Sequence, residues 1–375
     1  MDDGQKLNHL RWLVLSRLPD TAVKSLISLL AQFPSLIALL QSLDSLPANL
    51  PDKLVSTLKQ LASAQITSPF LLCQDDDWQW LQRHHGIIVD WYHSDYPALL
   101  KQLPDPPLVL FCRGDTSLLG QPQLAIVGSR GATKSGLELA RLFAADLAKH
   151  GFVVTSGLAV GIDGSAHRGA LATGKTIAVV GTGLDINYPK QHRALIEDIL
   201  QQGLVVSELP LGSPPLAFHF PRRNRLIAGL SLGTLVVEAK VKSGSLITAK
   251  LAMESGREVF AMPGSIHNPL SRGPHQLIQQ GATLVQTSAD IVAQLSAGLS
   301  FLAQTVEAEP EPLPTVFNSR QQKLLAAMGF DIMCVDDIVL SSDMDVAEVG
   351  CLLLELELAG AIIVEAGGYQ KVTVI

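Results

Sequence analysis

Cysteine is scarce and unpaired in this chain. The four cysteines, Cys73, Cys112, Cys334 and Cys351, lie far apart, and no two of them form a C-x-x-C pair. Because disulfides are rare in the cytoplasm, this usage indicates reduced thiols in a cytoplasmic protein. Long apolar runs are also lacking, and the start, "MDDGQKLNHLRWLV", carries two acids where a secretory leader would be basic and then apolar. We therefore expect no membrane span.

Charged residues make up only 17% of the 375 residues, and hydrophobic residues make up 47%. This composition provides a large buried core, and the length favours two or three domains. The net charge of −7 would discourage nucleic-acid binding, but it is unevenly distributed. Residues 120–300 contain 16 Lys and Arg against 11 Asp and Glu, and the rest contains 12 against 24. A basic middle is compatible with an anionic ligand; chance segregation of solvated charge is the alternative.

The first 85 residues predict a small all-helical domain. Leucines recur at helical spacing around residues 26–40, and four prolines separate short segments. From residue 86 the pattern changes to apolar runs that alternate with amphipathic stretches. Runs at 87–89 and 108–111 predict strands added to a sheet edge. The strongest runs lie at 124–128, 152–157, 176–181, 204–208, 234–239 and 259–264.

Continuous Val, Ile and Leu strands that alternate with helices are typical of a parallel sheet covered on both faces. The fold class expected for residues 86–300 is therefore an α/β, Rossmann-like, doubly wound, mostly parallel sheet. Residues 301–316, with three prolines and three glutamates, predict a linker. Residues 317–375 predict helices followed by a hairpin at Gly367–Gly368, which is typical of a winged helix.

Each predicted core strand ends in small or polar residues, as in "GSRGATKSG", "GTGLDINYP" and "EAKVKSGS". Ligands of open parallel sheets bind at this carboxyl edge, where backbone N–H groups and helix N-termini attract anions. Seven basic residues share these loops, which favours a phosphate-rich ligand: Arg130, Lys190, Arg222, Arg223, Arg225, Lys240 and Lys242. The loop from Gly128 fails the G-x-G-x-x-G pattern at two places, so a tightly held NAD is not expected.

The stretch "GALATGKT" at 169–176 matches the phosphate-loop pattern G-x-x-x-x-G-K-S/T. Such a loop must follow a strand and open a helix. Here a helical stretch precedes Lys175 and a predicted strand follows it. We therefore expect Gly174 to end a helix and Lys175 to lie at the opposite edge of the sheet. An NTP-dependent motor is not favoured.

Two further stretches leave alternatives open. Asp163 and His167, four residues apart, could form a metal or acid–base pair, but helix capping by Asp163 and a hydrogen-bonded His167 are favoured. "FHFPRRNR" at 218–225 places Phe218 and Phe220 beside three arginines. Rings that stack on bases beside guanidinium groups that hold phosphates are typical of single-strand binders. A core phenylalanine with salt-bridged arginines is the alternative.

Taken together, "AIVGSR", "TSGLAVGIDGSAH", "GKTIAVVGTGLDINYP", "FPRRNRLIAGLS" and "VVEAKVKSGSLITAKLA" resemble the DNA-processing protein A family (DprA, also called Smf) over roughly 90–290. The resemblance implies a non-catalytic, sequence-independent single-stranded DNA binder without a cofactor. It also implies a sterile-alpha-motif-like N-terminal domain, a homodimer formed through the Rossmann-like domain, and a role in loading RecA recombinase onto incoming strands during natural transformation.

The same resemblance implies a set of strand-binding residues: Gly128, Ser129, Arg130, Gly183, Lys190, Phe220, Arg223, Asn224, Arg225, Ser243 and Gly244.

The charge of the C-terminal domain differs from that of a winged helix that reads DNA. Residues 331–375 contain nine acids and one basic residue, Lys371. A helix that reads duplex DNA needs basic side chains, so we expect protein docking or regulation there.

An enzyme is the alternative function. "LSLGTLVVEA" at 230–239 loosely resembles the G-G-x-G-T-x-x-E pattern of nucleotide phosphoribohydrolases, in which Glu238 would assist cleavage of the N-glycosidic bond. Leu230 and Ser231 stand in place of the paired glycines, and Glu238 falls one position late.

Overall fold

The computed structural model describes residues 3–47, 49–65, 67–72, 74–303, 317–328, 333–359, 361–365 and 368–371. Contacts divide the chain into two compact units, Met1–Leu302 and Ala303–Ile375. Residues 301–303 of the predicted linker end helix α14, and residues 304–316 lie outside the described residues.

Short helices fill the first part of the chain, as the prolines and leucines predict. Pro19 and Pro51 precede α2 and α4 with φ of −65° and −56°, which suit the fixed φ of proline. Leu26, Leu29 and Leu39 are buried, whereas Ile37 of the same pattern is 51% exposed. The helices are α1 Asp3–Leu15, α2 Asp20–Leu30, α3 Leu36–Gln41, η1 Leu43–Ser45, α4 Asp52–Ser63, α5 Pro69–Leu72 and α6 Asp75–Arg83.

Within the described residues, nine strands form one sheet in the order β1-β2-β6-β5-β4-β3-β7-β8-β9. Neighbours from β6 through β9 are parallel, and β2 pairs antiparallel with both β1 and β6 at one edge. The strands are β1 Gly86–Asp90, β2 Val109–Gly114, β3 Gln123–Val127, β4 Val153–Ser156, β5 Thr176–Val179, β6 Leu204–Ser207, β7 Gly233–Val236, β8 Glu258–Ala261 and β9 Thr283–Leu284. All eight predicted strands are present, and β9 was not predicted.

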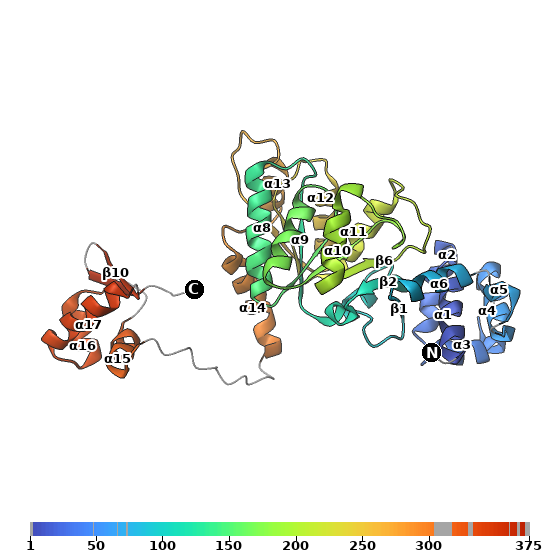
Figure 1. Cartoon of the computed structure of the whole chain (residues 1–375), viewed down its shortest axis with the longest axis horizontal. Coiled ribbons are helices and arrows are strands. Elements are labelled where there is room, and N and C mark those ends of the chain that lie inside the picture. Colours follow the sequence, from blue (N-terminus) through green and yellow to red (C-terminus); the bar gives the residue numbers. More distant parts are fainter. Residues whose placement is uncertain are drawn as a thin grey trace. The chain divides into compact units, whose positions relative to one another are not determined.

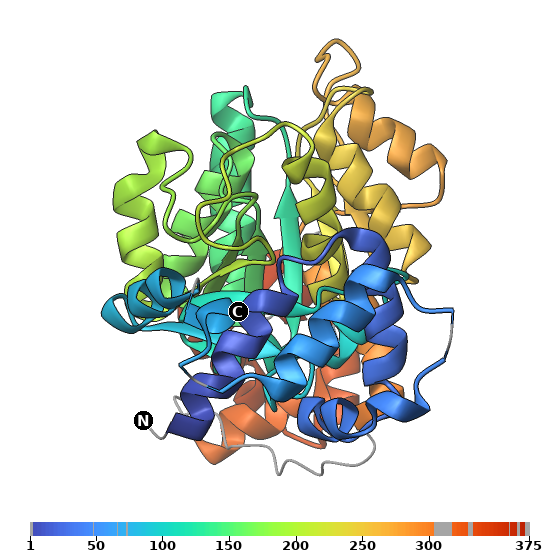
Figure 2. The same cartoon turned by 90° about the vertical axis from the view of Figure 1, so that its right-hand side faces the viewer.

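Helices cover both faces of the sheet, as continuous apolar strands require. Side chains alternate along β3: Leu124 and Ile126 pack with α8 and α9, whereas Ala125 and Val127 belong to the core that contains α11 and α12. Figure 2 shows the green and yellow helices on either side of the central strand. The helices are α7 Ala98–Lys101, η2 Thr116–Gly120, α8 Lys134–Lys149, α9 Ile162–Thr173, η3 Lys190–His192, α10 Arg193–Gln202, α11 His219–Leu230, α12 Gly244–Glu254, α13 Arg272–Gln279 and α14 Ser288–Ala303.

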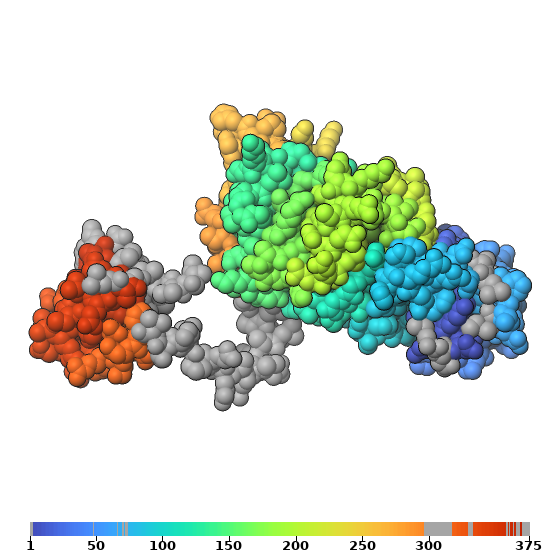
Figure 3. Space-filling model, in the orientation of Figure 1, coloured from blue at the N-terminus to red at the C-terminus, as the bar shows by residue number. Residues whose placement is uncertain are grey.

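The N-terminal helices adjoin the antiparallel edge of this sheet. Helices α1 and α6 contact β1, and the Tyr92 hydroxyl donates to the carbonyl oxygens of Leu30 and Phe33 at 2.9 and 3.0 Å. Figure 1 shows these helices beyond β1 and β2, and the space-filling view shows residues near 100, in cyan, between the blue helices and the green body (Figure 3).

The phosphate-loop match at 169–176 has the predicted reversed context. Helix α9 ends at Thr173, Gly174 is its C-cap, and β5 begins at Thr176. The exposed Lys175 therefore lies at the amino end of a strand, at the edge opposite to the one where ligands of parallel sheets bind.

The second unit contains helices followed by a hairpin, as predicted. Leu324, Ile338, Val349 and Leu356 are fully buried in its core. Gly367 of the predicted turn lies outside the described residues, and Gly368 begins the second strand of the hairpin. Its elements are α15 Ser319–Ala327, α16 Val335–Ser342, α17 Val346–Leu358, and the antiparallel strands β10 Ile362–Glu365 and β11 Gly368–Lys371. In the described parts of the chain, every helix is too short or too polar to cross a membrane.

Candidate nucleic-acid interface

A cleft of about 810 Å³ opens at the carboxyl edge of the sheet, beside strands β3 and β7. These strands pair in register from Leu124↔Gly233 to Val127↔Val236. The chain leaves β3 toward β4 and leaves β7 toward β8, on opposite sides, so this pair is the topological switch point where such sheets bind ligands. Eight of the predicted strand-binding residues line the cleft: Gly128, Ser129, Arg130, Phe220, Arg223, Asn224, Ser243 and Gly244.

The loop that follows β3, residues 128–133, is fixed by its backbone. The Ser129 N–H donates to the Glu238 carbonyl oxygen at 2.6 Å, and the Ser129 carbonyl accepts from the Ile162 N–H at 3.2 Å. Gly161 has φ of 89°, and a Cβ there would collide with the Ser129 carbonyl oxygen. Only glycine suits that close approach. Arg130 is exposed at the tip of the loop and has no ion-pair partner among the described residues.

Two aromatic rings line the cleft beside Arg130. The guanidinium carbon of Arg130 lies 5.8 Å from the centroid of the Phe220 ring, and the Tyr188 ring centroid lies 5.5 Å from that of Phe220. Phe218 is 65% exposed, contacts His219 edge to face, and does not line the cleft. The sequence prediction missed Tyr188. Its position in the loop after β5, directly before Pro189 and Lys190, was the available signal.

Arg223 and Asp163 form the floor of the cleft. Arg223 is buried, and its Nη1 donates to the carbonyl oxygens of Gly157, at 2.7 Å, and Val179. The Asp163 carboxylate accepts from the N–H groups of Gly157 and Ala159 at 3.1 and 3.3 Å. Burial raises the pKa of Asp163 to about 6 and lowers the pKa of Arg223 to about 10, while the charge of each opposes the shift of the other. Arg223 and Asp163 thus place opposite charges near each other below the surface of the cleft.

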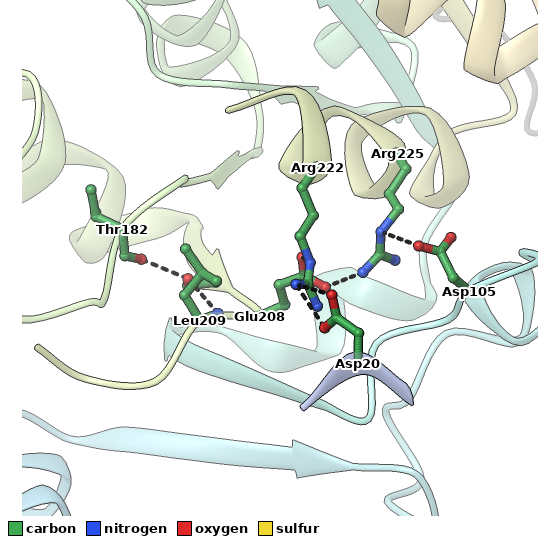
Figure 4. Close-up of polar contacts among 8 residues, drawn as sticks. Asp20, Asp105, Thr182, Glu208, Leu209, Arg222 and Arg225 are labelled. Carbon is green, nitrogen blue, oxygen red and sulfur yellow. Dashed lines mark hydrogen bonds and ion pairs between the residues drawn. The ribbon is translucent and has the colours of Figure 1, made fainter. Parts of the chain in front are cut away.

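Arg225 and Arg222 project from another side of α11, toward acids outside the cleft (Figure 4). Arg225 is buried and pairs with Glu208 and with Asp105, the latter at 3.2 Å. Arg222 pairs with Glu208 at 2.9 Å and with Asp20 of helix α2 at 2.9 Å. The structure therefore does not bring Arg225 to the cleft. The alternative interpretation of "FHFPRRNR", salt-bridged arginines, holds for these two residues.

The N-terminus of α12 forms the opposite wall. Asn224 Nδ2 donates to the Gly244 carbonyl at 3.2 Å, and Ser245 Oγ donates to the Gly128 carbonyl at 2.8 Å, which ties the two walls together. Ser243 is the N-cap residue, and its buried hydroxyl has no partner among the described residues. The nearby Lys240 and Lys242 are exposed. This wall combines two exposed ammonium groups with the positive end of a helix dipole.

Gly183 and Lys190, both predicted strand contacts, lie outside the lining of the cleft. Gly183 is buried; its N–H donates to the Ser213 carbonyl at 2.9 Å, and a Cβ there would lie 2.8 Å from the Pro210 carbonyl oxygen. Its role is close packing between two loops. Lys190 is exposed at the start of η3, two residues beyond Tyr188.

Asp163 does not cap helix α9, in contrast to the prediction. The N-cap is Gly161, and the Asp163 carboxylate binds the loop that precedes it. His167 is hydrogen-bonded as predicted: its Nδ1 lies 2.7 Å from Thr176 Oγ1, which donates to the Val154 carbonyl. Nδ1 therefore carries the proton. Burial lowers the pKa of His167 to about 3. The described residues contain no group of acids, histidines or cysteines that could hold a metal ion.

Glu238, the candidate catalytic acid of the enzyme alternative, is buried and fully engaged. Its Oε2 accepts from the Thr133 N–H at 2.8 Å, and its Oε1 accepts from the Thr133 hydroxyl at 2.8 Å and from Asn268 Nδ2 at 3.3 Å. It does not line the cleft. A carboxylate held in this way has no access to a substrate in the cleft.

Family comparisons match both units of the chain. The model of the family described as DNA recombination-mediator protein A matches residues 87–296, and a DprA winged helix domain matches residues 307–368. Protein Smf from Escherichia coli is 46% identical over 303 residues, which cover 78% of this chain and 79% of that protein. DNA processing protein DprA from Streptococcus pneumoniae is 50% identical over 200 residues, which cover 53% of this chain and 71% of that protein.

Solved structures agree with this assignment. The X-ray structure of Streptococcus pneumoniae DprA superposes with a TM-score of 0.60 and 39% identity, and the alignment covers 75% of this chain and 95% of that one. A structure of DNA processing protein A from Helicobacter pylori, described by its single-stranded DNA binding mode, gives a TM-score of 0.52 and 32% identity over 57% of this chain and 96% of that one.

Proposed function

This chain belongs to the DNA recombination-mediator protein A family, and from that premise we propose that it binds single-stranded DNA in the cleft beside β3 and β7. The observation that carries the proposal is the contact between Arg130 and Phe220 in a cleft whose other wall presents Lys240 and Lys242. These cationic side chains can bind phosphates while a base stacks on the Phe220 ring. The Helicobacter pylori relative, whose structure is described by single-stranded DNA binding, supports the same ligand class.

The side chains of the cleft favour a single strand over a duplex. They also favour binding that is independent of the base sequence. A ring can stack on a base only when that base is unpaired and turned outward. Sequence reading needs free amide or guanidinium donors aimed at base edges. In this cleft Asn224 is bonded to the Gly244 carbonyl, and Arg223 is bonded to strand-end carbonyls. The exposed guanidinium of Arg130 is assigned to a phosphate in this proposal. Stacking and phosphate binding are therefore the main contributions, and both tolerate any base.

The function that we propose is binding without catalysis and without a cofactor. The engagement of Glu238 by Thr133 and Asn268 supports this, because a base for N-glycosidic cleavage would have to reach the substrate. Incubation of the purified protein with AMP should release no adenine. Release of free base that is lost in Glu238→Gln would instead support the enzyme alternative.

The wider role follows from the family resemblance. We propose a cytoplasmic homodimer, formed through the Rossmann-like domain, that protects incoming strands and helps load RecA during natural transformation. The acidic C-terminal unit is proposed to dock a protein, because its α17 contains three glutamates and no basic residue. Adding the protein to strands coated with single-strand binding protein should shorten the lag of RecA ATP hydrolysis. An unchanged lag would remove the loading role.

The binding proposal is tested with the Arg130→Ala variant. Fluorescence anisotropy of a labelled poly-dT oligonucleotide should show a loss of about 1–3 kcal/mol in binding free energy, the contribution of a charge-assisted hydrogen bond to phosphate. Unchanged affinity in a variant that melts like the wild type would remove Arg130 from the interface.

A further inference from the structure

A protein carboxylate occupies the N-terminus of α8, the first helix after the switch-point strand β3. Both oxygens of Glu238 accept hydrogen bonds from Thr133, the N-cap residue of this helix, at 2.8 Å each. Gly136, in the first turn, leaves room for the carboxylate: a Cβ there would lie 2.5 Å from its carboxyl carbon. The helix dipole stabilises a negative charge at this position.

In dinucleotide-binding sheets of this class, the same helix end holds the ligand's pyrophosphate. Here an internal anion fills that place. A ligand phosphate is therefore excluded from the end of α8, by both occupancy and charge repulsion. Within the cleft, phosphates can still approach Arg130 and Lys242, which are exposed, and the N-terminus of α12 on the other wall.

Glu238 also holds the loop that carries Arg130 at both ends. Its backbone carbonyl accepts from the Ser129 N–H at 2.6 Å, and its carboxylate accepts from Thr133. Arg130 stands between these two anchors. Because Arg130 has no ion-pair partner of its own among the described residues, its guanidinium is positioned by the backbone of residues 129–133 and by the contact with the Phe220 ring.

From this geometry we propose that Glu238 is a positioning residue for strand binding and that it acts through Arg130. The proposal deepens the proposed function and rests on it. Glu238 touches no DNA. By occupying the anion place at α8, it fixes the 128–133 loop so that the Arg130 guanidinium, rather than the helix end, meets the phosphate.

A double-mutant cycle in the full-length chain tests this proposal. Binding of a labelled poly-dT oligonucleotide is measured for Glu238→Gln, Arg130→Ala and the combination. Glutamine keeps the shape but cannot accept bonds at both positions. We expect each single change to weaken binding by about tenfold, as loss of a charged hydrogen bond does, and the combination to weaken it no further than Arg130→Ala alone. Each should also make the negative slope of log affinity against log salt shallower by about 0.7, which corresponds to one phosphate contact on a single strand.

Lys242→Ala supplies the matched control, since Lys242 lies on the other wall. Its effect should multiply with that of Glu238→Gln. Wild-type affinity in a folded Glu238→Gln variant, or effects that multiply with Arg130→Ala, would overturn the proposal. If Glu238→Gln does not fold, Thr133→Val removes one of the same hydrogen bonds and enters the same cycle with the same expected result.

This experiment distinguishes loss of strand binding from loss of the positioning role of Glu238. A wild-type chain that does not bind the oligonucleotide overturns the proposed function together with this proposal. Wild-type binding with an unaffected Glu238→Gln variant overturns only the positioning role.

Discussion

The guanidinium of Arg130 lies over the ring of Phe220, 5.8 Å from its centroid, although the two residues follow different strands of the sheet. Arg130 follows β3, and Phe220 lies in α11, which follows β6. The contact places a guanidinium that can bind phosphate beside a ring that can stack on a base, and each can be removed separately.

Phe220→Ala should weaken binding of a poly-dT oligonucleotide by about 1–3 kcal/mol, the contribution of one base stacked on an aromatic side chain. Phe218→Ala is the matched control, because Phe218 is more exposed but lies outside the cleft lining. Anisotropy titrations of both variants check the expectation. Equal losses would mean that exposure, rather than position in the cleft, decides which ring contacts DNA.

Two exposed lysines allow binding in the cleft to be distinguished from binding at the phosphate-loop match at 169–176. Lys242 lines the cleft, and Lys175 precedes β5 at the opposite edge. Lys242→Ala should make the negative slope of log affinity against log salt shallower by about 0.7, because one contact with the DNA backbone is lost. Lys175→Ala should leave the slope unchanged. A larger effect of Lys175→Ala than of Lys242→Ala would mean that the DNA binds at the amino edge of the sheet and not in the cleft.

Arg225 is expected to matter for stability rather than for binding. Its guanidinium and the Glu208 carboxylate are almost fully buried, and breaking a buried pair costs up to about 3–5 kcal/mol of the free energy of unfolding. Arg225→Met should therefore lower the midpoint of urea denaturation. At a temperature where both proteins are folded, the affinity for single strands should stay within about twofold of wild type. The loss of one charged hydrogen bond to DNA would reduce the affinity by much more. A folded variant with strongly reduced affinity would return Arg225 to the interface.

His167 should make the fold sensitive to acid. Its pKa in the folded chain, about 3, is below the ordinary 6.5, so between these values the unfolded chain binds a proton that the folded chain does not. The stabilisation is complete above pH 6.5, and the free energy of unfolding falls below it by about 1.4 kcal/mol per pH unit.

Asp163 acts in the opposite direction. Its raised pKa, about 6, stabilises the folded chain as the pH falls below that value. The wild type is therefore compared with His167→Asn, which retains Asp163. Urea denaturation from pH 7 to 5 should show the two curves of stability converging as the pH falls. Parallel curves would mean that His167 is protonated in the folded chain.

The fold could be predicted in detail because its strands are continuous apolar runs, and burial on both faces leaves little alternative. β9 escaped prediction because two residues give no periodic signal. Residues that are adjacent in "FPRRNR" point to different sides of α11. Phe220, Arg223 and Asn224 line the cleft, whereas Arg222 and Arg225 pair with Glu208. Successive residues of a helix point about 100° apart, so adjacent arginines need not share a role.

Other features of the site depend on contacts between distant segments. Tyr188 reaches Phe220 across two loops, and Glu238 reaches Thr133 from the neighbouring strand. Neither contact could be predicted from the separation of its two residues along the chain. Composition indicated a basic centre, but which cations are free depends on where the acids lie. Only the folded chain places Glu208 beside Arg225 and leaves Arg130 without an ion-pair partner in the described part of the chain.

The most direct test of the account is a set of anisotropy titrations of the wild-type chain with labelled poly-dT, mixed-sequence single strands and the matching duplex, repeated at several salt concentrations. Single strands of either sequence should bind with similar affinity and more tightly than the duplex, and log affinity should fall linearly with log salt. Equal affinity for the duplex, or an affinity that does not change with salt, would contradict single-strand binding in this cleft.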